Sequence, residues 1–134
     1  MELEFDYKNY FTVEELKNRG YDLEADGILD TEHFPSMEYA IDDFMNDAFD
    51  TIYTLVENYR GAEWTEAFFT DMARDDLSGE ALKFKQRLNK ALIEQAIFIY
   101  DNGNTKATFD DGRKAYAPKA VEALWRNALN CGRG

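Results

Sequence analysis

KFKQRLNKALIEQAIFIY, residues 83–100, is the stretch that decides how this chain folds. Its first half is amphipathic, because apolar and neutral residues recur there at helical spacing. They are Phe84, Leu88, Ala91 and Gln95. From residue 91 onward, apolar side chains surround almost the whole helical circumference, and a helix of that kind is normally buried on several sides. The sequence therefore predicts one long central helix, with the rest of the chain packed around it.

The ends and the polar residues of this helix lead to further predictions. Ser78 is placed to cap its start, and Gly103, which follows Asn102, is placed to end it. Glu94 and Gln95 lie in the otherwise apolar half, so each needs a hydrogen-bonding partner if it is buried.

Cationic side chains gather in the first half of the same helix, where they oppose the helix dipole. They are Lys83, Lys85, Arg87 and Lys90. We call them the basic patch. In so acidic a chain the patch either meets an acidic partner surface, including residues 35–60 of another copy, or pairs with neighbouring acids of its own fold.

Length and composition bound the class of protein. The 134 residues are 45% hydrophobic and 15% aromatic, which fits one folded domain, residues 1–134, with a real core. No apolar run approaches the roughly 18 residues that span a bilayer, and the N-terminal residues show no signal-peptide pattern. We therefore expect no membrane association and a cytosolic origin.

Charge and rare residues exclude several functions. A formal net charge of −12 argues against a nucleic-acid binder held by phosphate contacts, and fits a surface that repels DNA or mimics it. The single Cys131 excludes an internal disulfide and a cysteine-based zinc site, and the single His33 leaves little for histidine catalysis. The chain also contains no phosphate-binding loop, nucleophile elbow or zinc-protease motif. We expect no enzyme activity and no cofactor.

The N-terminal residues 1–11 predict an extended arm that docks on its own core through aromatic rings. The rings belong to Phe5, Tyr7, Tyr10 and Phe11. Thr12 and Glu15 then form a capping-box pattern, which predicts a short helix that runs to Arg19 and stops at Gly20.

Residues 22–33 partly match a calcium-binding EF-hand loop. Acids stand at positions 1, 3, 5 and 9 of the loop and a glycine at position 6, but position 12 is His33 instead of a bidentate glutamate. Such a loop binds calcium weakly at best, and the alternative is an acidic surface loop turned by Gly27.

A helical stripe predicts a second long helix, with Pro35 in its first turn and Gly61 at its end. The stripe consists of Met37, Ile41, Phe44, Ala48, Ile52, Leu55 and Tyr59. The other side carries an acidic face, made of Asp43, Asp47, Asp50 and Glu57. Carboxylate sites in helical bundles usually include a histidine partner, which is missing here, so a solvated face is favoured over a catalytic or dimetal site.

The remaining segments complete the plan. Residues 61–76 predict a short helix, whose core-facing residues are Trp64, Ala67, Phe68 and Met72; Trp64, Phe68 and Phe69 could alternatively line a ligand pocket. Residues 104–117 surround Asp111-Gly112, a hairpin signal, and predict a projecting loop or β-hairpin. Pro118 starts a last helix, with Val121, Leu124, Trp125 and Ala128 on one face, and residues 130–134 form a polar tail. The expected fold is all-α, a small bundle of about four to five helices with that projection between the last two.

Two segments, RLNKALIEQAIFIYDNGN (87–104) and APKAVEALWRNALNCGRG (117–134), resemble the head–tail connector, or adaptor, proteins of tailed bacteriophages. The matching residues of the first segment are Lys90, Ala91, Leu92, Ile93, Glu94, Gln95, Asn102 and Gly103, and those of the second, matched more loosely, are Pro118, Ala120, Leu124 and Leu129. The opening YFTVEELK and residues 40–43 fit as well. The aromatic residues 64–69 and the final glycines, arginine and cysteine depart from the family's pattern.

The resemblance implies a structural subunit of the virion neck that assembles from the host cytoplasm. It docks in a ring, typically of twelve copies, beneath the portal protein, extends the channel for passing DNA and receives a tail-side stopper or neck protein. Residues 105–116 and 118–129 carry the portal and ring contacts in this family. The expected interface residues there are Thr105, Lys106, Phe109, Arg113, Lys114, Tyr116, Trp125 and Arg126, joined by Lys83, Lys85 and Arg87 of the basic patch.

Two further functions stay open from the sequence. The charge and the carboxylates 43, 50 and 57 also suit an acidic inhibitor that mimics DNA, a class that phages also encode. A calcium-responsive module through residues 22–33 is the third.

Overall fold

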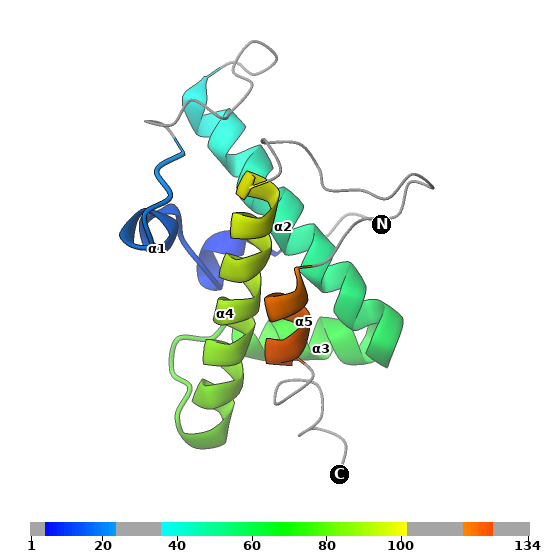
Figure 1. The fold of residues 1–134 in the computed structure, drawn as a ribbon. Helices are drawn as coiled ribbons and strands as arrows, with labels where there is room; N and C mark the ends of the chain where they lie inside the picture. The colour runs from blue at the N-terminus through cyan, green and yellow to red at the C-terminus, as the bar shows by residue number, and fades with distance from the viewer. Residues whose placement is uncertain (1–4, 24–35, 102–116, 125–134) are drawn as a thin grey trace.

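The computed structural model describes residues 5–23, 36–101 and 117–124 (Figure 1). Its elements are the 3₁₀-helix η1 (Tyr7–Asn9) and the α-helices α1 (Val13–Asn18), α2 (Met37–Arg60), α3 (Ala62–Met72), α4 (Gly79–Asp101) and α5 (Pro118–Ala123). These residues are mostly helical and contain no strand, so the all-α prediction is confirmed. The predicted loop or hairpin lies outside the described residues except at Ala117.

The central helix is α4, which contacts α1, α2, α3 and α5. Figure 1 shows it running through the middle of the molecule. Every residue from 91 to 97 is buried, which confirms that the apolar half is covered on several sides. The helix begins at Gly79, directly after Ser78, the predicted capping position, and the helix formers Glu80, Ala81 and Leu82 fill its first turn.

Glu94 and Gln95, the two buried polar residues of α4, both have hydrogen-bonding partners, as predicted. The backbone N–H of Ala117 donates to Gln95 Oε1 at 2.8 Å, and Arg19 Nη2 lies 3.3 Å from Glu94 Oε2. Ala117, the last residue of the predicted loop 104–117, is only 4% exposed and belongs to the core. Pro118 occupies the first turn of α5, as predicted.

Helix α2 confirms the second long helix, but its buried face differs from the predicted stripe. Ser36 caps its start by accepting from the Tyr39 N–H, and Gly61 ends it at a φ of 88°. Tyr59, expected in the core, is 48% exposed. The buried face also takes in Met45, Phe49, Tyr53 and Val56. The face is this wide because α2 contacts η1, α3 and α4 at once.

Helix α3 buries Phe68 and Met72 as predicted but is rotated relative to the expected face. Ala67 is exposed, and Thr65 and Phe69 are buried in its place. The Thr65 hydroxyl donates to the Gly61 carbonyl at 2.7 Å, which satisfies that buried side chain within its own helix.

The N-terminal segment docks through its rings, as predicted, but it is not extended, because residues 7–9 form η1. The Tyr10 hydroxyl donates to the Phe69 carbonyl at 2.7 Å, and the Tyr7 hydroxyl donates to Asp42 Oδ1 at 2.8 Å. The capping box of Thr12 and Glu15 is confirmed, and α1 ends before Gly20.

One hydrophobic cluster contains residues of η1 and of all five described α-helices. None of these helices has the length and apolar character that crossing a membrane requires.

Candidate functional site

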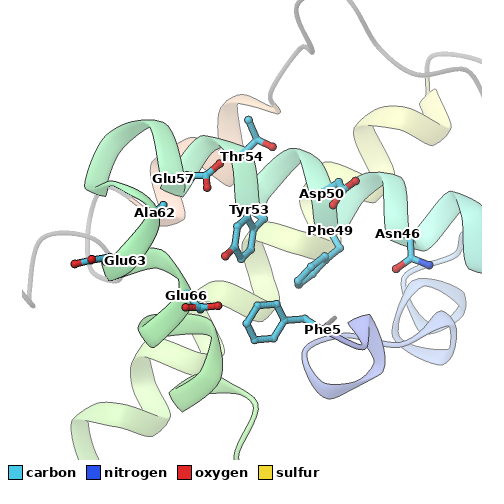
Figure 2. Close-up of a pocket in the computed structure, with 10 residues that line it drawn as sticks. All are labelled: Phe5, Asn46, Phe49, Asp50, Tyr53, Thr54, Glu57, Ala62, Glu63 and Glu66. Carbon is cyan, nitrogen blue, oxygen red and sulfur yellow. The ribbon is translucent and has the colours of Figure 1, made fainter. Parts of the chain in front are cut away.

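An open hollow of about 940 Å³ lies between α2 and α3, beside the N-terminal segment (Figure 2). We call it the acidic hollow. Its lining residues are Phe5, Asn46, Phe49, Asp50, Tyr53, Thr54, Glu57, Ala62, Glu63 and Glu66. The hollow therefore collects side chains from three separate segments of the chain.

The rim of the acidic hollow carries four carboxylates. Asp50 and Glu57 come from α2, where a separation of seven residues, about two turns, keeps them on one side of the helix. Glu63 and Glu66 come from α3 and are three residues apart, so they also share a face. No lysine or arginine is among the described residues that line the hollow, so its local potential is negative.

The floor of the acidic hollow is aromatic. Phe5 lies 5.8 Å from Tyr53 and 6.4 Å from Phe49, measured between ring centroids. Phe49 and Tyr53 both pack on Phe69, with centroid distances of 5.5 and 4.8 Å. Because these rings are held by one another and by the core, the floor is preformed.

Tyr53 places one polar group in this floor. The residue is only 5% exposed, yet its hydroxyl makes no hydrogen bond within the described part of the chain. Figure 2 shows the Tyr53 oxygen directed toward the α3 side of the hollow, where Glu66 lies. Burial, together with the charges of Glu57 and Glu66, raises the pKa of the Tyr53 phenol above its ordinary value of 10.0.

This arrangement suits a positively charged organic group. Carboxylates at the rim accept hydrogen bonds from ammonium or guanidinium groups, and aromatic faces attract the same cations and pack on their aliphatic stems. In residues 5–23, 36–101 and 117–124, no three acidic, histidine or cysteine side chains are grouped so that they could hold a metal ion.

The structure divides the predicted acidic face into two parts. Asp50 and Glu57 reach the acidic hollow, while Asp43 and Asp47 lie outside it on α2. Asp43 and Asp50 are exposed, whereas Asp47 and Glu57 are half-buried, so only part of this face is a fully solvated one.

Glu63, Glu66 and Tyr53 are the ionisable residues of the hollow that were not predicted from the sequence. A signal for the two glutamates was present, because they share one face of a helix that follows directly after Gly61. The sequence does not show how α3 packs against α2, and it is this packing that brings Glu63 and Glu66 close to Asp50 and Glu57.

The four residues of the basic patch differ in their exposure and in their contacts. The Lys83 side chain is 73% exposed and lies 4.0 Å from Glu80, and Lys90 is exposed. Lys85 Nζ donates to the Arg74 carbonyl at 2.6 Å, so this cation is engaged within its own fold. Arg87 is half-buried. Lys83, Arg87 and Lys90 remain as one stripe along α4.

A second, smaller hollow of about 330 Å³ lies between α3 and α4 and is mostly apolar. Trp64 and Phe68 line it, as the alternative pocket in the sequence analysis required, but Phe69 does not. Trp64 stacks on Phe68 with a centroid distance of 5.0 Å, and the Arg60 guanidinium lies 4.4 Å from the centre of the Trp64 ring. Trp64 therefore already packs against both Phe68 and Arg60.

Several predicted site residues lie outside the described residues. They are Thr105, Lys106, Phe109, Arg113, Lys114, Tyr116, Trp125 and Arg126. Most of the candidate calcium loop, residues 24–33, lies outside them too.

Comparison with protein-family models, curated proteins and solved structures finds no match to this chain.

Proposed function

We propose that this chain is a head–tail connector, a structural subunit that forms a ring under a phage portal and performs no catalysis. The motif resemblance in residues 87–104 and 117–134 suggests this class, and the packing of α5 on α4 is the observation that carries it. The proposed neighbours are the portal protein on one side, a tail-side stopper or neck protein on the other, and further copies of the chain.

The relevant packing joins the two segments that bear the resemblance. Helix α4 runs to Asp101, and the Ala117 N–H binds Gln95, six residues before that end. Asp101 and Ala117 therefore both lie toward the same end of α4. A connector of this class needs that plan, because the segment between the two helices makes its contacts while both of its ends are held by the core.

The charge distribution supports the same proposal. A ring made of head-to-tail contacts needs two different complementary surfaces on each copy. The acidic hollow on α2 and α3 and the basic patch on α4 are two such surfaces. A net charge of −12 also suits a channel wall along which DNA passes without binding.

The decisive experiment counts copies of the chain in virus particles. Tailed particles of a phage that encodes it would be purified and analysed by quantitative mass spectrometry, with the portal protein as the internal standard. We expect about as many copies of this chain as of the portal, because stacked rings of matched symmetry share their copy number. Absence from the particles, or a few copies in sub-stoichiometric amount, would refute the proposal.

A second candidate is an acidic inhibitor that mimics DNA, and one observation favours it. The carboxylates Asp50 and Glu57 are joined by Glu63 and Glu66 of the neighbouring helix, so the negative surface extends beyond one helix face. Immobilised chain should then retain a nuclease or another DNA-binding protein from host extract, and salt should release it. Failure to retain such a protein, or retention that salt does not weaken, removes this candidate.

A further inference from the structure

We infer that the acidic hollow binds basic side chains of the α4 patch of a second copy, so that copies of this chain associate head to tail. The inference rests on the proposed function, in which each copy contacts others of its kind. It adds the contact itself, which is Lys83 or Arg87 of one copy seated between α2 and α3 of the next.

The acceptor side is more than a group of acids. Its floor is the packed rings of Phe5, Phe49 and Tyr53. Tyr53 is only 5% exposed, and its hydroxyl, which reaches the hollow, has no hydrogen-bonding partner in the described residues. A lysine or arginine satisfies all of these groups together. Its stem covers the rings, its N–H groups donate to the phenol oxygen, and its charge is balanced by Glu63 and Glu66.

The basic side chains on α4 that would enter the hollow make few favourable contacts within their own chain. Lys83, Arg87 and Lys90 follow one another at spacings of four and three residues, so they form one stripe on α4. They stand in the first half of the helix, where the dipole disfavours positive charge. Lys83 has only a 4.0 Å approach to Glu80, with both side chains largely exposed, and such a pair contributes little.

The two surfaces belong to different elements, so the contact is not self-complementary. The hollow is built by α2, α3 and Phe5, whereas the stripe lies on α4. Contacts of this heterologous kind generate rings or open filaments, depending on the rotation between copies. Two chains of net charge −12 repel each other at a distance, so the association depends on the local match of charge.

The test uses the purified full chain in sedimentation velocity over a range of protein concentrations. We expect reversible association that weakens when salt is raised from about 50 mM to about 500 mM, because screening acts on the rim charges. The double variants Glu63→Lys/Glu66→Lys and Lys83→Glu/Arg87→Glu should each weaken self-association by about tenfold or more. Mixed in equal amounts, the two variants should associate again, since the intact stripe of the first fits the intact hollow of the second.

A matched control separates the hollow from general charge. Asp43→Lys/Asp71→Lys changes the net charge by as much as Glu63→Lys/Glu66→Lys does. Asp43 and Asp71 are exposed residues of the same two helices, but they do not line the acidic hollow. This variant should self-associate at least as well as the wild type, because it lowers the long-range repulsion. Tyr53→Phe changes no charge and should weaken association by about threefold to tenfold if the phenol accepts from the bound cation. Circular dichroism verifies that each variant is folded.

Zero-length carbodiimide cross-linking of mixed isotope-labelled and unlabelled chains gives an independent readout. We expect cross-linked peptides of hybrid mass that join Glu63 or Glu66 of one copy to Lys83 or Lys90 of another. The inference is overturned if the chain stays monomeric and yields no hybrid cross-link, or if the control variant is impaired as much as the hollow variants. Neither result alters the copy number in virus particles, so the proposed function is tested separately.

Discussion

The Gln95 carboxamide is 1% exposed and accepts the backbone N–H of Ala117, itself buried at the start of α5. This single hydrogen bond joins two helices that are separated in the chain by residues 102–116. A buried N–H without a partner costs about 1–3 kcal/mol, so the side chain at position 95 contributes to holding α5 on α4.

Gln95→Leu should therefore lower the free energy of unfolding by about 1–3 kcal/mol, measured by urea denaturation, because Ala117 loses its acceptor. The control Gln86→Leu changes the same residue type at an exposed position of the same helix and should stay within about 0.5 kcal/mol of the wild type. Equal stability of the Gln95 variant and the wild type would show that α5 does not depend on this bond.

Gly61 joins α2 to α3 with a φ of 88° and a ψ of 160°, a conformation that only glycine adopts readily. A Cβ atom at this position would meet nothing within 4 Å, so the cost of a side chain lies in the backbone alone. Gly61→Ala should lower the free energy of unfolding by about 1–3 kcal/mol. Thermal and urea unfolding measure this loss of stability. The control is Ala62→Gly, at the exposed residue that follows Gly61. If Gly61→Ala were as stable as the wild type, the backbone at Gly61 would not be strained for other residues.

At the scale of elements, the N-terminal segment is part of the core and not an appendage. Tyr7, Tyr10 and Phe11 are at most 4% exposed. The Tyr10 ring stacks on the Phe49 ring with a centroid distance of 5.4 Å and meets the Phe69 ring edge-on with a centroid distance of 5.5 Å. Its hydroxyl donates a hydrogen bond to the Phe69 carbonyl. The segment thus fills the space between α2 and α3 below the acidic hollow.

Phe11→Ala should destabilise the protein by about 3–5 kcal/mol, because removing a fully buried ring leaves a cavity in the core. Urea denaturation followed by far-ultraviolet circular dichroism measures this loss. Asn9→Ala, an exposed change in the same segment, is the control. A loss below about 1 kcal/mol for Phe11→Ala would mean that the segment folds onto the helices only weakly.

At the scale of the whole molecule, buried tyrosines couple stability to alkaline pH. Burial is the main cause that raises the pKa of Tyr7, Tyr10 and Tyr53 above the ordinary value of 10.0. The folded chain therefore keeps these protons at a pH at which the unfolded chain releases them. The stability that these protonated tyrosines contribute is fully present below about pH 10 and is lost as the pH rises above that value.

The free energy of unfolding should fall above about pH 10, by about 1.4 kcal/mol per pH unit for each tyrosine that stays protonated in the fold. Urea denaturation at several pH values measures the slope. Tyr10→Phe removes one of these groups and should reduce the slope by its share, while Tyr39→Phe, at a residue that is 60% exposed, should leave it unchanged. A slope that is the same in both variants would contradict the role of Tyr10.

The ends of the elements and the central helix could be predicted from the sequence, because local interactions determine them. The capping box of Thr12 and Glu15, the stops at Gly20 and Gly61 and the start at Pro118 all involve residues close together in the chain. The burial of residues 91–97 followed from their composition, since a helix that is apolar all round must be covered.

Tertiary structure alone decided which faces turn inward and where the acidic hollow forms. Helix α2 meets three elements, so its buried face is wider than one stripe, and α3 turns Phe69 inward instead of Ala67. Spacing within one helix gives the relative positions of Glu63 and Glu66 but not their neighbours. Only the packing of α3 on α2 brings them to Asp50 and Glu57 above the ring of Tyr53.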